Sequence, residues 1–184
     1  MYIGFHPSNQ IESSRHFRKK CYWSNNGSYF SKKLSEQLEF DSGCFFVSFY
    51  TRLLSSNFLN KYENRVLNFH PSILPACRSM DGFGDTVKSG SRFIGSTVHF
   101  VDEGIDTGKP LIQSCYPFQS DLSLNMNRHR VFVQQCKMLI QLVEWLNDGR
   151  IVGTNILDAK YEFSEFVPNL DSDIAINFTI DWQN

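Results

Sequence analysis

The sequence lacks most of the features that would assign it at once to a specialised class of protein. Its apolar runs, such as 44–47, are only a few residues long, whereas a membrane-spanning helix needs roughly 20. Residues 1–10 show no basic stretch followed by an apolar core, so we expect no secretory signal. Charge is balanced, with 18 Lys plus Arg against 19 Asp plus Glu. Because neutralising phosphates takes a basic excess, we predict no nucleic-acid partner, and no membrane partner either.

Cysteine is sparse and has no paired spacing. The five cysteines are Cys21, Cys44, Cys77, Cys115 and Cys136. An odd set without close pairs indicates neither a disulfide framework nor a zinc site. We therefore predict reduced thiols, a cytoplasmic location and no bound metal.

Apolar residues are abundant enough for one folded domain. The chain has 184 residues, of which 41% are hydrophobic and 15% aromatic, and a chain of this length buries one sizeable core rather than two. We distinguish a divergent amino-terminal segment of that domain at 1–43, a regular core at 44–150 and a carboxyl-terminal tail at 151–184.

Hydrophobic patterning predicts strands that alternate with helices. Short apolar or β-rich runs are typical of strands and occur at 1–5, 44–49, 65–69, 95–101, 110–116 and 151–152. Helices are predicted after a cap at Ser31 and over 55–62, 84–89 and 123–148. The strand, helix and strand between 44 and 69 form a βαβ unit. The expected class is α/β, with a mostly parallel central sheet flanked by helices and a long helix near the C-terminus.

The first group of candidate functional residues lies at the end of the strand at 65–69. Side chains alternate along a strand, so Asn68 and His70 emerge on the same side at its carboxyl end. In open α/β sheets that end is where ligands bind. Pro71 restricts His70 to extended backbone angles. A donor amide and a titratable base are thus held side by side.

The second group is the carboxylate-rich loop at 102–108, in which Gly104 and Gly108 flank Asp106. These glycines are expected to permit backbone conformations closed to other residues and close approach of a ligand. If the strand at 95–101 lies near the one at 65–69, Asp106 can reach His70. Amide, imidazole and carboxylate together suit acyl transfer to an amine, which needs an oxyanion donor, a proton carrier and an anion to orient that carrier.

Two stretches resemble the core of the formyltransferases that use 10-formyltetrahydrofolate. The first is 68–75 (Asn-Phe-His-Pro-Ser-Ile-Leu-Pro) and the second is 95–108 (Gly-Ser-Thr-Val-His-Phe-Val-Asp-Glu-Gly-Ile-Asp-Thr-Gly). The resemblance covers roughly 44–150, and its pattern is closest to that of phosphoribosylglycinamide formyltransferases. It implies a Rossmann-like formyltransferase fold. The amino-terminal edge of the sheet is expected to be short, because a βαβ unit takes roughly 30 residues and 1–43 holds about one.

The resemblance also implies a role for each matched residue. Asn68 would donate its side-chain amide to the oxyanion, His70 would be an electrophilic or proton-transferring group, and Asp106 would position His70 and relay protons. The folate pterin would lie between two loops, whose residues are Arg52, Leu53 and Leu54 in one and Val101, Asp102, Glu103, Gly104 and Ile105 in the other.

The implied activity is formyl transfer from 10-formyltetrahydrofolate to a primary amine of a small acceptor, such as glycinamide ribonucleotide in purine biosynthesis or an amino-sugar nucleotide. Two alternatives stay open, namely a formyltetrahydrofolate hydrolase and a folate-binding module without catalysis. The stretches 4–9 and 76–83 depart from the family pattern, which leaves the acceptor undefined. A homodimer is also left open.

Overall fold

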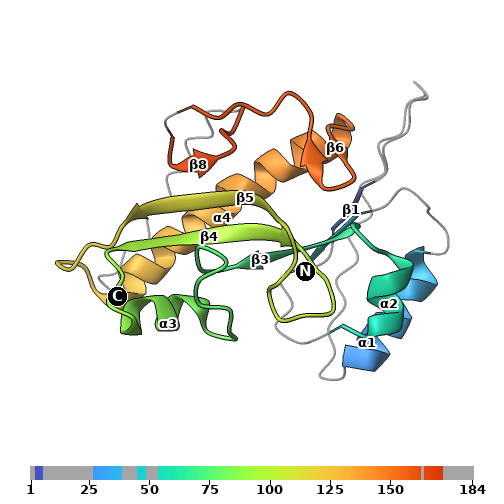
Figure 1. Cartoon of the computed structure of the whole chain (residues 1–184), viewed down its shortest axis with the longest axis horizontal. Coiled ribbons are helices and arrows are strands. Elements are labelled where there is room, and N and C mark those ends of the chain that lie inside the picture. Colours follow the sequence, from blue (N-terminus) through green and yellow to red (C-terminus); the bar gives the residue numbers. More distant parts are fainter. Residues whose placement is uncertain (1–2, 6–26, 39–44, 49–53, 163, 172–184) are drawn as a thin grey trace, which may run out of the picture.

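The computed structural model describes residues 3–5, 27–38, 45–48, 54–162 and 164–171. A six-stranded sheet in the order β1-β2-β3-β4-β5-β8 forms its centre (Figure 1). The strands of this sheet are β1 (Ile3–Phe5), β2 (Phe45–Ser48), β3 (Val66–His70), β4 (Phe93–Phe100), β5 (Pro110–Pro117) and β8 (Phe166–Val167). A separate hairpin consists of β6 (Ile151–Val152) and β7 (Asn155–Ile156).

Four helices flank the sheet in the described part of the chain: α1 (Gly27–Leu38), α2 (Ser56–Lys61), α3 (Gly82–Lys88) and α4 (Leu124–Asn147). The long helix α4 crosses one face of the sheet, and α1 and α2 lie together at the end where β2 and β3 pair (Figure 1). Most of the predicted elements are confirmed to within two residues. None of the helices that the structure describes is long and apolar enough to span a membrane.

The sheet is mixed, whereas a mostly parallel sheet was expected. Only β2 and β3 run parallel among the described strands, joined through α2 as the predicted βαβ unit. The pairs β3–β4 and β4–β5 are antiparallel. The connection between β4 and β5 spans 101–109, which is shorter than the crossover of about a dozen residues that parallel neighbours need. A hairpin is therefore the arrangement that this loop permits.

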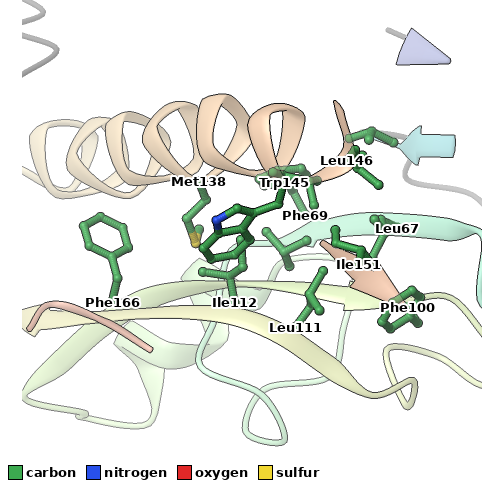
Figure 2. Close-up of a cluster of buried hydrophobic side chains, with 13 residues drawn as sticks. Leu67, Phe69, Phe100, Leu111, Ile112, Met138, Trp145, Leu146, Ile151 and Phe166 are labelled. Carbon is green, nitrogen blue, oxygen red and sulfur yellow. The ribbon is translucent and has the colours of Figure 1, made fainter. Parts of the chain in front are cut away.

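The main hydrophobic core lies between α4 and the sheet (Figure 2). Met138, Trp145 and Leu146 point from α4 toward Leu67 and Phe69 of β3 and toward the strands beside it (Figure 2). Trp145 is fully buried. Burying a large apolar side chain contributes about 1.5–3 kcal/mol, so this face of the sheet carries most of the packing.

Alternation along β3 separates packing from chemistry. Leu67 and Phe69 belong to the core under α4, whereas Val66 belongs to the cluster formed with α1 and α2. Asn68 and His70 share the side of Val66, because side chains two residues apart point to the same face. The polar residues thus emerge on the face that α4 leaves uncovered.

The cap predicted at Ser31 is wrong, whereas α2 and α4 have serines at their N-cap positions, of which only Ser123 makes a side-chain cap hydrogen bond. Ser123 accepts a hydrogen bond from the Met126 backbone N–H and caps α4, and Ser55 is the N-cap residue of α2. Ser31 is not a cap, because α1 begins at Gly27 and places Ser31 inside the helix. Its buried hydroxyl oxygen instead accepts a hydrogen bond from the Ser55 backbone N–H at 2.9 Å. Ser31 therefore ties α1 to the start of α2.

Candidate active site

Two neighbouring strands present the polar groups of the candidate site. Asn68 and His70 lie on β3, and in the antiparallel register they face His99 and Thr97 of β4. Residues opposite one another in such a pair share a face of the sheet. His70 and His99 are buried, with 3% and 2% of their surface exposed. The sheet therefore fixes two histidines and one amide within a single patch.

Asp106 reaches this patch from the loop between β4 and β5. Its Oδ2 atom lies 3.2 Å from Nδ1 of His70. Asn68, His70 and Asp106 line the same cavity, whose volume is about 270 Å³. The structure thus brings together the three residues that the two motifs single out.

The loop holds Asp106 by a different means from the one expected. Neither Gly104 nor Gly108 adopts positive φ; Asp106 itself does, at 51°, and aspartate tolerates this conformation because its short side chain bonds locally. The glycines are needed for contacts within the chain. A Cβ on Gly108 would overlap the Phe100 carbonyl, and one on Gly104 would overlap the Thr107 side chain.

The His70 ring is held at both nitrogens by groups that only accept hydrogen bonds. Nε2 donates to the Cys77 carbonyl at 2.9 Å, and Nδ1 faces the Asp106 carboxylate. Gly82 packs against the same edge of the ring, because a Cβ there would lie 2.5 Å from Nε2. Only the doubly protonated ring satisfies both acceptors. This arrangement favours the electrophilic role of His70 over that of a mobile proton carrier.

His99 is a residue of the site that the sequence did not single out. Its Nδ1–H donates to the Phe100 carbonyl at 2.8 Å, so the neutral ring presents Nε2 as an acceptor. Burial lowers the pKa of His99 despite the opposing influence of the Phe100 carbonyl and the Asp106 carboxylate. Nε2 is buried without a hydrogen-bond partner, 3.5 Å from Asp106 Oδ1. The observation that identifies His99 as part of the site is the strand register, which places it opposite Asn68.

Two residues that line the cavity carry acceptor atoms that no donor of the described residues satisfies. The Asn68 side-chain oxygen, like His99 Nε2, is buried without a partner. Such groups cost free energy unless a donor reaches them. A ligand that carries several N–H groups, such as a primary amine, is the kind of molecule that would satisfy them.

The residues expected to hold the folate lie on the cavity where they are described. Leu54, Val101, Asp102, Glu103, Gly104 and Ile105 line it, and Arg52 and Leu53 fall outside the described residues. Asp102 is bonded within its own loop, to the Gly104 backbone N–H and the Thr107 hydroxyl. Met80 and Ile105 also border the cavity and remain more than half exposed. Of these two rim residues, the sequence indicated Ile105 and missed Met80.

Comparison with known proteins gives a family for this arrangement. A family model described as "Formyl transferase" matches residues 6–143. The chain belongs to the formyl transferase family. Because the match includes β3, β4 and the loop with Asp106, the candidate site lies inside the family region.

Individual relatives are similar over part of their length. A phosphoribosylglycinamide formyltransferase from Bacillus subtilis (strain 168) is 30% identical over 131 residues, which cover 71% of this chain and 66% of the relative. The chloroplastic enzyme of that name from Vigna unguiculata is 31% identical over 127 residues, 64% of this chain and 41% of the relative. The chain thus spans less than two thirds of these two proteins.

Solved structures support the fold assignment. Glycinamide ribonucleotide transformylase 1 from Symbiobacterium toebii superimposes with a TM-score of 0.61 at 28% identity, over 69% of this chain and 61% of that one. Phosphoribosylglycinamide formyltransferase from Streptococcus pneumoniae TIGR4 gives 0.60 at 25% identity, over 66% and 68%. The predicted formyltransferase fold is therefore confirmed.

Proposed function

We propose that this protein transfers a formyl group from 10-formyltetrahydrofolate to a primary amine of a small acceptor, with glycinamide ribonucleotide as the first acceptor to test. The convergence of Asn68, His70 and Asp106 beside one cavity supports the proposal, with 3.2 Å between His70 Nδ1 and Asp106 Oδ2. The names of the relatives point to the same acceptor. Folate would supply a formyl group that is already activated for transfer to nitrogen.

The chain's own residues can stabilise charge at two places. The Asn68 amide, once its NH₂ faces the reacting oxygen, donates to the negative charge that develops there as the amine adds. His70, whose ring nitrogens contact the Cys77 carbonyl and the Asp106 carboxylate, lies two residues along the same strand and presents its ring beside the same cavity. Both side chains line the cavity before substrate binds, so the orientation of the Asn68 amide is the main adjustment that the reaction needs.

The amine proton has a receiving group in the same patch. Asp106 Oδ1 and His99 Nε2 lie 3.5 Å apart, and no donor of the described residues bonds to this Nε2 atom. An amine N–H at this position would meet acceptors on both sides, and the proton it loses can pass to either atom. As the new bond between the amine nitrogen and the formyl carbon forms, the bond between that carbon and the folate nitrogen breaks, and the leaving nitrogen takes up the proton that the amine lost. We assign Asp106 and His99 jointly to this step. Burial of the site strengthens these interactions because water is excluded.

A turnover assay with three arms tests the proposal. The purified chain is incubated with 10-formyltetrahydrofolate alone, with glycinamide ribonucleotide added, and with a panel of amino-sugar nucleotides and other small amines. Formylated amine as the product supports the proposal, and the productive arm identifies the acceptor. Formate released equally in all arms would indicate a hydrolase. Folate binding by calorimetry without turnover on any amine would indicate a binding module and overturn the proposal.

A further inference from the structure

We propose that Gln135 of α4 is a positioning residue that fixes the end of β3, and with it the His70 ring, through the hydroxyl of Ser96. The catalytic consequence of this inference rests on the proposed function, whereas the structural link does not. Gln135 and Ser96 come from the face of the sheet that carries the core. They therefore act on His70 from behind the cavity.

A chain of two hydrogen bonds makes the link. Nε2 of Gln135 donates to Ser96 Oγ at 2.9 Å. The same hydroxyl donates to the backbone carbonyl of His70 at 2.7 Å. Ser96 is completely buried, and its bond to the His70 carbonyl is shielded from water. When one hydroxyl accepts a hydrogen bond and donates the next, as Ser96 does here, the two bonds polarise and strengthen one another.

A second, independent set of bonds holds the residues that follow His70. The Thr97 hydroxyl donates to the Ser72 carbonyl at 2.8 Å and accepts from the Leu74 backbone N–H at 3.1 Å. It also accepts from Gln113 Nε2 at 3.1 Å. Consecutive residues of β4 point to opposite faces. Ser96 and Thr97 therefore bond to the 70–74 segment from opposite faces of the sheet. At His70 itself, the side-chain bond to the carbonyl is that of Ser96.

The position of His70 leaves little room for a shift. Its ring lies between the Cys77 carbonyl, Gly82 and Asp106, with the distances given above. A misplacement of about 1 Å at a reacting group can cost roughly 100-fold in rate. A buried carbonyl that lost its Ser96 partner would also seek another donor. Removing the Gln135 amide therefore weakens the support of the His70 backbone without touching the cavity.

A matched pair of variants on α4 tests the role. Gln135→Leu removes the amide and keeps the bulk of the side chain. Gln134→Leu makes the same change one residue earlier, where the amide donates to Glu165 near β8 instead. We expect kcat to fall roughly 10-fold in Gln135→Leu with little change in KM, and kcat to stay at the wild-type value in Gln134→Leu. Ser96→Ala removes the hydroxyl that joins the two hydrogen bonds and should therefore reproduce the effect of Gln135→Leu.

A double-mutant cycle separates positioning from a general loss of structure. In a His70→Asn background there is no imidazole ring to position, so adding Gln135→Leu should lower the residual kcat by less than twofold, in contrast to the roughly 10-fold loss expected in the wild-type background. Equal losses in both backgrounds would overturn the inference. Equal kcat in Gln135→Leu and Gln134→Leu would do the same.

A spectroscopic readout does not depend on activity. The ring ¹⁵N signals of His70, identified by their loss in His70→Asn, should move in Gln135→Leu and Ser96→Ala and stay in place in Gln134→Leu. Unmoved signals in Gln135→Leu would overturn the positioning role. If the wild-type chain turns over no amine, the proposed function fails, and these spectra still decide whether Gln135 holds His70.

Discussion

Asn68 offers the most direct test of the proposed chemistry at the scale of a single residue. Its side chain lines the cavity, and its oxygen has no hydrogen-bond partner in the part of the chain that the structure describes. Asn68→Ala should therefore lower kcat about 100- to 1,000-fold, the usual cost of losing one oxyanion donor, and should leave the free energy of unfolding almost unchanged. Steady-state kinetics and urea unfolding measure the two quantities. Wild-type turnover in Asn68→Ala would remove the oxyanion role.

His99 should make stability depend on pH in a predictable direction. Burial lowers the pKa of His99 below its ordinary value of 6.5. As pH falls through that value, His99 takes up a proton in the unfolded chain but stays neutral in the folded chain, so acid favours unfolding. His99→Asn keeps a donor for the Phe100 carbonyl but cannot titrate. The variant should lose less stability than the wild type between about pH 7 and 5.

Urea unfolding curves for the two proteins at both pH values provide the measurement. Parallel losses of stability in wild type and His99→Asn would contradict a neutral, buried His99. A steeper loss in the variant would contradict it as well.

The residues of the site divide into those that spacing reveals and those that need the folded chain. Asn68 and His70 were predictable because their two-residue spacing places them on one side of a strand, whatever the rest of the fold. His99 was not, because its importance comes from the β3–β4 register and from burial. The need for glycine at position 108 could not be predicted either, because the carbonyl that a Cβ would overlap belongs to Phe100, at the other end of the loop.

At the scale of elements, the first residue of α3, Gly82, packs directly against the His70 ring. The Cα atom of Gly82 is so close to the ring that a Cβ at this position would lie 2.5 Å from His70 Nε2 and 2.8 Å from Cε1. Gly82→Ala should therefore displace the imidazole and lower kcat about 10-fold or more. Alanine favours helix by about 1 kcal/mol relative to glycine, which offsets part of the steric cost in stability. Turnover and thermal unfolding of the same preparations separate the two effects, and unchanged kcat would show that the ring can move freely.

Element type was easier to predict from the sequence than element pairing. The helix α4 was recognisable because Ser123 and Gly149 mark its ends and apolar residues recur at helical spacing. The sheet order was not, because strand direction depends on which loops are too short for a crossover. Ser31 illustrates the same limit, since its pattern suits a cap but its hydroxyl bonds to Ser55 in another helix.

At the scale of the whole molecule, the sheet separates stability from chemistry. The face under α4 carries the largest apolar cluster, and the opposite face carries the cavity with His70, His99 and Asp106. The link through Gln135 and Ser96 crosses from the first face toward the second. Substitutions on the α4 side that leave this link intact should therefore change stability and leave kcat per folded molecule unchanged.

The tail after α4 gives a test of this separation. Asp171 accepts hydrogen bonds from Trp145 Nε1 at 2.6 Å and from Arg150, and its backbone N–H bonds to Gln141. Asp171→Ala leaves the indole N–H of the fully buried Trp145 without an acceptor, which should cost about 1 to 3 kcal/mol in the free energy of unfolding. Asp171→Asn keeps an acceptor and should lose less. Both variants should turn over at the wild-type rate at temperatures where they are folded.

The charge of Asp171 adds a dependence on pH. Burial opposes its ionisation, but the hydrogen bonds from Trp145 and Arg150 outweigh burial and lower its pKa below the ordinary value. The folded chain therefore gives up this proton more readily than the unfolded chain. The resulting stabilisation is complete above the ordinary aspartate value of about 4 and disappears as pH falls through the lowered pKa. Urea unfolding of wild type and Asp171→Asn should accordingly differ most at neutral pH, approach one another as pH falls below about 4, and converge below the lowered pKa of Asp171; a difference that persists there would mean that packing, not charge, ties the tail to α4.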